Sequence, residues 1–287
     1  MEIDFVELAS RDKVRLVGSY FAPRGESRGG ADAIVLCPGT SAEFYSQPLP
    51  TVAHAAADAG YGALTLSTRG RGIVWRDPAT GFKGAGFERI SDCVEDFAGA
   101  IDFLARRGHR RVVLWGHSLS GVKVLYAAAH DPHPAIAGVI SVAGPRWSAE
   151  HYLTLPVAAE YERHRRTAEA MVAEGRGGDL FPVAFPPARP SRPPKASSTS
   201  TPTRNTTRCA GPIRSGCALP DRRRRGSFGP AVRHGRPCRP VAGDGPAKRR
   251  QPGGHDPNTD HLFSGAHDAL ASAVVGWLDA LPVEVPV

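Results

Sequence analysis

The sequence lacks the marks of a membrane-spanning or disulfide-bonded protein. No run of eighteen apolar residues occurs among its 287 residues, so it predicts no membrane-spanning helix. The first five residues are acidic and alternating, unlike the basic and then apolar regions of a secretory signal, and we therefore expect a cytoplasmic protein. Five cysteines, an odd number without the spacing of metal ligands, favour neither a disulfide framework nor a metal site.

The segment 186–254 lacks glutamate and has few large apolar side chains. Its 69 residues include 13 prolines, 14 arginines and two lysines, against Asp221 and Asp244 as its only carboxylates. The segment therefore carries a net charge of +14 and the rest of the chain −6, which together give the formal +8. Its large apolar side chains are Ile213, Leu219, Phe228, Val232 and Val241. Such a segment cannot bury enough apolar surface to offset the ordering of its backbone, which costs about 1–2 kcal/mol per residue.

Three explanations of this segment remain open. It is a basic disordered insert that binds nucleic acid or anionic lipid by releasing counterions, a linker between two modules, or a stretch translated out of frame. We favour the third, because GC-rich DNA read in the wrong frame encodes mostly Arg, Pro, Ala, Gly and Ser. With suitable codons, residues 196–201 shifted by one nucleotide spell Phe-Leu-Asp-Lys-Tyr, which suits a helix far better. This hypothesis also requires a second, compensating shift before Asp260.

Outside this segment, short apolar runs alternate with helical patterns. Val94, Phe97 and Ile101, at spacings of three and four, predict a helix at about 90–107. The continuous apolar run at 33–37 is typical of a strand buried on both faces. The expected strands are 3–8, 14–21, 33–37, 62–66, 111–115 and 138–143, and the expected helices are 48–59, 90–107 and the stretch after Ser118. This order predicts an α/β fold: a mostly parallel twisted sheet with helices on both faces, followed by an irregular C-terminal third.

The chain divides into three parts on this basis. Residues 1–185 form the core, and 148–175 within them is helical, either as a cap over a cleft or as a plain surface helix. Residues 186–254 are the basic, Pro- and Arg-rich segment. Residues 255–287 return to the core with a loop and a last helix.

The motif at 116–121, Gly-His-Ser-Leu-Ser-Gly, lies between a predicted strand and a predicted helix. A serine on such a sharp turn presents its hydroxyl to a cleft, beside the N–H groups at the start of the helix. The turn needs small residues two positions before and two after the nucleophile, because larger Cβ substituents would collide there. Gly116 and Ser120 meet this need around Ser118, whereas a nucleophile at Ser120 would put Val122 in such a position. Ser118 is therefore the candidate nucleophile.

This turn and three other motifs resemble the α/β-hydrolase fold. The other motifs are Pro38-Gly39-Thr40-Ser41 after an apolar strand, the Arg-Gly turn at 69–72, and 258–263 followed by a helix that ends at 274–278. The resemblance covers about 1–145 and 258–281. It implies that Ser118 is the nucleophile, that His261 is the general base, and that the backbone N–H groups of Thr40 and Leu119 form an oxyanion hole. It also implies chemistry without a metal or an organic cofactor.

The chemistry of these residue types agrees with the resemblance. A serine hydroxyl is a poor nucleophile until a base such as a near-neutral histidine takes its proton. Preplaced donors for a tetrahedral oxyanion typically contribute about 10²–10³ in rate each. The chain order, serine before histidine, is that of this fold, and the 143 positions between Ser118 and His261 are no obstacle because such sites assemble in space. His117 we expect to pack or hydrogen-bond locally.

The carboxylate that would orient the histidine is not assigned. The fold requires it in the segment 186–254, where Asp221 and Asp244 lack a convincing strand before them, and Glu150 is an outside candidate. By comparison with known triads, its loss would lower kcat on the order of 10⁴-fold.

The expected function is cleavage of a carboxylic ester or related small acyl compound through a covalent acyl-enzyme. The alternative is a catalytically impaired relative, or a protein that binds polyanions through its basic segment. We do not expect nucleic-acid binding, and the sequence leaves the oligomeric state undetermined.

Overall fold

A six-stranded sheet forms the centre of the computed structural model, which describes residues 3–183, 189–191 and 260–283. The strand order is β1-β2-β4-β3-β7-β8, in which β2 is antiparallel to both neighbours and β4, β3, β7 and β8 are parallel. The strands are β1 (Asp4–Ala9), β2 (Arg15–Phe21), β3 (Ala33–Cys37), β4 (Gly62–Ser67), β7 (Val112–His117) and β8 (Ile136–Val142). The predicted, mostly parallel α/β sheet is confirmed.

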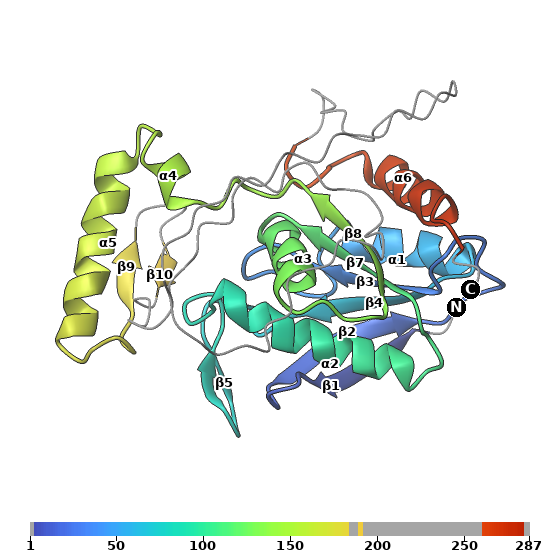
Figure 1. The fold of residues 1–287 in the computed structure, drawn as a ribbon, viewed down its shortest axis with the longest axis horizontal. Coiled ribbons are helices and arrows are strands. Elements are labelled where there is room, and N and C mark those ends of the chain that lie inside the picture. The colour runs from blue at the N-terminus through green and yellow to red at the C-terminus, as the bar shows by residue number, and fades with distance from the viewer. Residues whose placement is uncertain (1–2, 184–188, 192–259, 284–287) are drawn as a thin grey trace, which may run out of the picture. The chain divides into compact units, whose positions relative to one another are not determined.

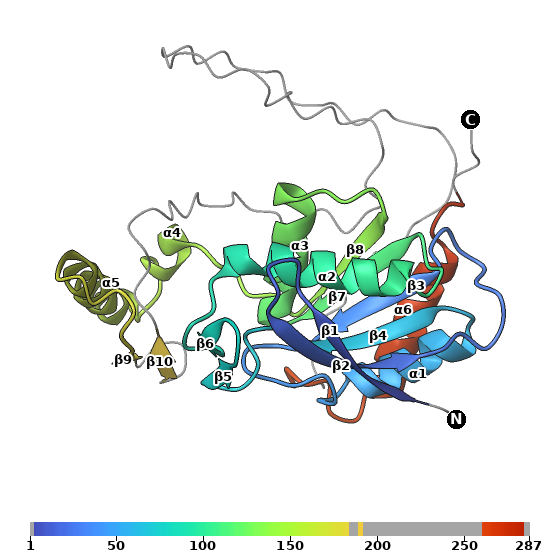
Figure 2. The same ribbon diagram turned by 90° about the horizontal axis from the view of Figure 1, so that it is seen from below.

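Helices cover both faces of this sheet (Figure 1). Turned by 90°, the sheet lies between α2 and α3 on one side and α1 and α6 on the other (Figure 2). The helices are α1 (Leu49–Asp58), α2 (Cys93–Ala105), α3 (Leu119–His130) and α6 (His267–Asp279). One apolar cluster joins the sheet to α2 and α3, and a second joins it to α1 and α6. Every residue of β3 and β4 is buried, because helices exclude water from both sides of these central strands.

Two local differences from the predicted elements have simple causes. The predicted helix at 90–107 begins as a 3₁₀ turn, Ile90–Asp92, before α2. The hairpin of β5 (Trp75–Asp77) and β6 (Gly81–Lys83) was not predicted, since strands of three residues show no alternation to detect.

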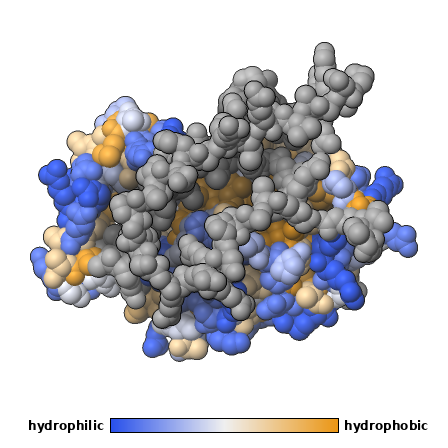
Figure 3. Space-filling view, in the orientation of Figure 1, coloured by the Kyte–Doolittle hydropathy of each residue, from blue (hydrophilic) through white to orange (hydrophobic). Residues whose placement is uncertain are grey.

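The region after β8 contains two helices, α4 (Ala149–Tyr152) and α5 (Ala158–Ala173), and a small hairpin of β9 (Phe181–Val183) and β10 (Arg189–Ser191). In α5 only Ala168 and Met171 are buried, and its other side chains include many paired charges. Hydrophilic residues accordingly gather over α5 in the space-filling view (Figure 3). The helices predicted within 148–175 are present, and their role as a cap stays a prediction.

Except for 189–191, the segment 186–254 lies outside the described residues, as do Asp221 and Asp244. The three explanations of that segment therefore stay predictions. Within the described part of the chain, no helix combines the length and the apolar character needed to cross a membrane.

Candidate active site

Ser118 stands on a sharp turn between β7 and α3. Its φ of 54° and ψ of −124° are unusual for a residue with a Cβ atom, and such backbone strain gathers at functional sites. A Cβ atom at Gly116 would lie 2.1 Å from the carbonyl oxygen of Ser120, so a glycine is required there, as the sequence predicts. The N–H of Ser118 donates to the carbonyl of Val142 at 2.9 Å, which ties the turn to β8. The turn is thus constrained by the close packing of Gly116 against Ser120 and by the hydrogen bond from Ser118 to β8.

Ser120, the second serine of the motif, makes a structural hydrogen bond. Ser120 is fully buried, and its hydroxyl donates to the carbonyl oxygen of Pro38. This bond connects the turn to the loop that follows β3. Because the Ser120 hydroxyl already has a partner inside the protein, Ser118 carries the available hydroxyl.

The loop after β3 lies directly against Ser118. A Cβ atom at Gly39 would be 3.0 Å from the Cβ atom of Ser118, so the close approach depends on the missing side chain. The N–H groups of Thr40 and Leu119 donate no hydrogen bond to any residue that the structure describes. Leu119 is the first residue of α3, where N–H groups have no partner within the helix. No described residue therefore occupies these two donors, one of which lies in the loop against Ser118 and the other in the residue after it.

His261 precedes α6, and the fold brings it to the turn. Its Nε2 atom lies 2.9 Å from Oγ of Ser118, although 143 positions separate the two residues. The carboxylate of Asp260 accepts the N–H groups of Leu262 and Ser264, and the bond from Ser264 lowers the pKa of Asp260. Asp260 therefore shapes the loop that presents the imidazole.

The imidazole has no carboxylate partner among the described residues. Asp260 uses its carboxylate on the backbone of its own loop. Glu150 is exposed in α4 and makes no hydrogen bond to His261. The structure thus unites the predicted serine and histidine and leaves the orienting acid unassigned.

His117 makes a long-range contact that sequence reasoning missed. We expected His117 to pack or hydrogen-bond locally; its ring does stack against Trp115, but its Nε2 donates to the distant backbone carbonyl of His261 at 2.8 Å. The side chain is 4 % exposed, and desolvation lowers the pKa of His117 by disfavouring its charged form. No local pattern in the sequence signals this bond, because its partner is 144 positions away.

Buried charges lie behind the turn on the α2 and α3 side of the sheet. Lys123 of α3 is 1 % exposed, with Nζ 2.5 Å from a carboxylate oxygen of Glu88 and 3.4 Å from the Thr68 hydroxyl. Burial alone would lower the pKa of Lys123, but Glu88 raises it, so this residue stays charged. Arg69 likewise pairs with Asp96 and with Asp12. These pairs fix the segments around the site without reaching Ser118.

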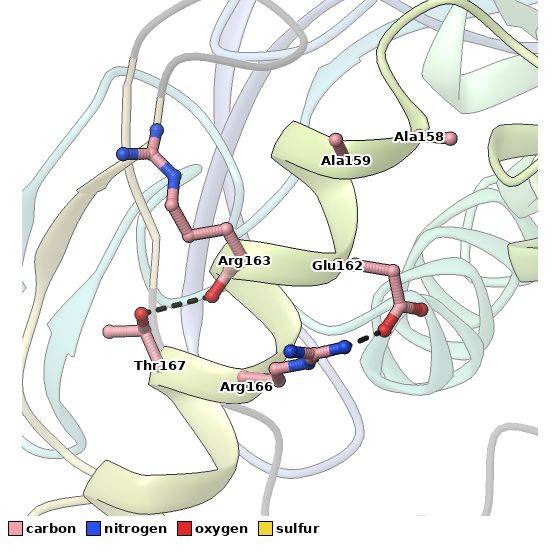
Figure 4. Close-up of a pocket in the computed structure, with 6 residues that line it drawn as sticks. All are labelled: Ala158, Ala159, Glu162, Arg163, Arg166 and Thr167. Carbon is pink, nitrogen blue, oxygen red and sulfur yellow. Dashed lines mark hydrogen bonds and ion pairs between the residues drawn. The ribbon is translucent and has the colours of Figure 1, made fainter.

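A large surface hollow among the described residues does not contain the candidate site. It has a volume of about 570 Å³, and its described lining comes from α5 alone (Figure 4). There Arg166 turns toward Glu162 and the Thr167 hydroxyl donates to the carbonyl of Arg163, so these groups already have partners. A hollow of about 280 Å³ is lined mostly by polar residues and includes Arg69 and Glu88, which are also paired. Neither hollow contains a nucleophile with a base.

Comparison with known proteins places the chain in a family. A search of the curated proteins found no match. The α/β hydrolase GrgF from Penicillium sp. sh18 is 22% identical, with a TM-score of 0.45 over 63% of this chain and 58% of that one. A highly thermostable carboxyl esterase from Bacillus coagulans is 15% identical, with a TM-score of 0.44 over 63% and 54%. DcsB, in complex with its substrate analogue, is 18% identical, with a TM-score of 0.49 over 63% and 56%.

The chain spans less than two thirds of the length of each of these solved structures. A family model described as the alpha/beta hydrolase family matches residues 34–285, which is most of the chain and includes both Ser118 and His261. The protein therefore belongs to the alpha/beta hydrolase family.

Proposed function

We propose that the protein is a serine hydrolase that cleaves a carboxylic ester or a related acyl compound through a covalent acyl-enzyme. The observation that carries the proposal is the 2.9 Å distance between Oγ of Ser118 and Nε2 of His261. A serine on a strained turn with an imidazole at hydrogen-bond distance is the arrangement that activates a hydroxyl as a nucleophile. Membership in the alpha/beta hydrolase family supports the same reaction class.

The reaction begins with proton transfer. His261 Nε2 takes the proton of the Ser118 hydroxyl as its oxygen bonds to the substrate carbonyl carbon. The carbonyl oxygen gains the electron pair and becomes an oxyanion, for which the N–H groups of Thr40 and Leu119 are the candidate donors. Because neither donates to another described residue, both are available to the oxyanion.

Collapse of the tetrahedral intermediate breaks the bond to the leaving alcohol, which receives the proton held by His261. Water then attacks the carbonyl carbon of the Ser118 ester while His261 takes a proton from the water. The bond between that carbon and Ser118 Oγ breaks, His261 returns the proton to Oγ, and the carboxylic acid leaves. The reaction needs no redox partner, because no atom changes its oxidation state overall and Ser118 and His261 end with the protons that they had at the start.

A fluorophosphonate probe, which bonds to activated serine hydroxyls, tests the proposal. The wild-type protein is expected to be labelled, and Ser118→Ala and His261→Ala to lose the labelling. Ser272→Ala is the matched control, because Ser272 is exposed in α6 and its hydroxyl donates to the carbonyl of Asp268 in the same helix, away from the candidate site. No labelling of the folded wild-type protein, or equal labelling of Ser118→Ala, would contradict the proposal.

A further inference from the structure

Two consecutive residues of the turn hold one distant residue. Ser118 Oγ lies 2.9 Å from the ring of His261, and His117 Nε2 donates to the backbone carbonyl of the same residue at 2.8 Å. Ser118 thus contacts the imidazole of His261, and His117 contacts the main chain of the same residue. Together they define where His261 lies relative to the turn.

The His117 ring is enclosed on several sides. Its centroid is 4.8 Å from that of His261, 6.1 Å from Phe263 in an edge-on arrangement, and 6.4 Å from Trp115, whose ring is nearly parallel to it. Trp115 and His117 are alternate residues of β7, so they lie on the same face of the sheet. Since only 4 % of His117 is exposed, packing restricts the ring to the orientation that makes the bond.

The protonation state of His117 follows from its partner. A carbonyl oxygen only accepts, so Nε2 of His117 must carry the hydrogen. Burial lowers the pKa of His117, which keeps the imidazole neutral at neutral pH, with its single hydrogen on Nε2. His117 therefore cannot serve as a second base for Ser118 through Nε2.

The other hydrogen bonds of the loop that carries His261 connect residues of the loop to one another or to the start of α6. Asp260 accepts from Leu262 and Ser264, and the N–H of Ala266 donates to the carbonyl of Phe263. Among the residues that the structure describes, the hydrogen bonds that join residues 260–266 to earlier strands and helices are those of His117 and Ser118. Of these two, the bond from His117 is the one that does not take part in proton transfer.

We propose that His117 is a positioning residue, which anchors the main chain of residue 261 so that its imidazole stays within reach of the Ser118 hydroxyl. This inference rests on the proposed function of Ser118 and His261. Misplacement of a reacting group by about 1 Å can cost on the order of 10²-fold in rate, so a main-chain anchor at this point acts on catalysis. It acts through the position of His261 and takes no part in proton transfer itself.

The test compares two substitutions that differ in the hydrogen-bond donor. His117→Phe keeps an aromatic ring and removes the donor, whereas His117→Gln keeps an N–H near the position of Nε2. His130→Phe is the matched control, because His130 is an exposed residue of α3 whose ring nitrogen bonds to the carbonyl of Tyr126 and whose ring stacks on Tyr126, within its own helix. Each variant is measured for kcat and KM on p-nitrophenyl acetate and for the rate of fluorophosphonate labelling.

We expect His117→Phe to lower kcat and the labelling rate about tenfold, as the loss of one hydrogen bond implies, with KM within twofold of wild type. His117→Gln should recover most of the loss, and His130→Phe should behave as wild type. A kcat for His117→Phe within twofold of wild type would overturn the inference, as would a His117→Gln variant as slow as His117→Phe.

A measurement on the unmutated protein keeps the inference testable if His117→Phe does not fold. Long-range ¹H–¹⁵N spectra of the histidine rings at pH 7–8 should show His117 as the neutral form with its hydrogen on Nε2. A hydrogen on Nδ1 alone would overturn the bond and the anchor. Failure of the wild-type protein to label at Ser118 would overturn the proposed function itself, whereas equal labelling of wild type and His117→Phe would overturn the anchor alone.

Discussion

At the residue scale, the site depends on two glycines, where a side chain would not fit, as much as on its polar side chains. Gly39 lets the loop after β3 approach Ser118, and Gly116 leaves room for the carbonyl of Ser120. Ser120 then binds that loop through its hydroxyl, which donates to Pro38. The proposed nucleophile, the loop with the candidate oxyanion donor and the start of α3 are therefore packed backbone against backbone, where small changes in volume matter.

We predict that Gly116→Ala destabilises the protein by about 1–3 kcal/mol, the usual cost of overpacking. The added Cβ would lie 2.1 Å from the Ser120 oxygen, and a backbone atom cannot rotate away. Urea denaturation gives the free energy of unfolding. Gly276→Ala is the control. This position is exposed in α6, and a Cβ atom added there meets no described atom within 4 Å beyond its chain neighbours and its own helix backbone, so alanine should raise the free energy of unfolding by about 0.5–1 kcal/mol. Equal stabilities of Gly116→Ala and wild type would contradict the prediction.

At the scale of elements, the short β5–β6 hairpin is stabilised by one buried carboxylate. Asp77 is 2 % exposed and accepts the N–H groups of Ala79 and Thr80 in the hairpin turn and of Arg15 in β2. Burial alone would raise the pKa of Asp77, but these donors lower it to about 2. A three-residue hairpin has little stability of its own, so this carboxylate connects it to the main sheet.

We predict that Asp77→Asn lowers the free energy of unfolding by about 1–2 kcal/mol at pH 7. Because the folded pKa lies below the unfolded value, the contribution of Asp77 is complete above about pH 4–5 and is lost as the pH falls toward 2. The difference between wild type and variant should shrink over that range in unfolding curves recorded from pH 7 downward. Asp102→Asn, at an exposed position of α2, should leave the pH dependence unchanged. A pH-independent difference for Asp77→Asn would show that the ionised carboxylate is not the cause.

At the scale of the whole molecule, buried ion pairs join segments that are far apart in the chain. Lys123 connects α3 to Glu88, 35 positions earlier, and Arg69 connects the loop after β4 to Asp96 in α2 and to Asp12 between β1 and β2. A buried charge that keeps its partner is tolerated, whereas one that loses it is costly. These pairs therefore favour one arrangement of the helices on this face.

We predict that Lys123→Met costs about 3–5 kcal/mol of stability, because it leaves the Glu88 carboxylate buried without a partner. The double variant Lys123→Met/Glu88→Gln should recover most of that loss, since no charge remains to be compensated. A double-mutant cycle by chemical denaturation measures the coupling. Additive effects of the two substitutions would mean that the pair does not stabilise the fold as a unit.

A further prediction about the whole molecule concerns its gene. If the basic segment at 186–254 is translated out of frame, another reading frame of the same DNA encodes a hydrolase-like strand, a loop with a carboxylate and a second strand. The nucleotide sequence of the gene tests this directly. Absence of such a frame would leave the insert and the linker as the remaining explanations.

The sequence by itself determined the strands of the main sheet, the helices that cover it and the turn at Ser118, because their causes act within a few residues. Continuous apolar runs predict buried strands, and the steric limits of a sharp turn explain Gly116 and the choice of Ser118. Longer-range features were accessible only through resemblance, as for His261. The bond from His117 to the carbonyl of residue 261, the Ser120 contact with Pro38 and the pairing of Lys123 with Glu88 were decided by the tertiary structure alone. These partners come into contact only when the whole chain folds. A local sequence pattern therefore does not identify the distant acceptor of a buried hydrogen-bond donor.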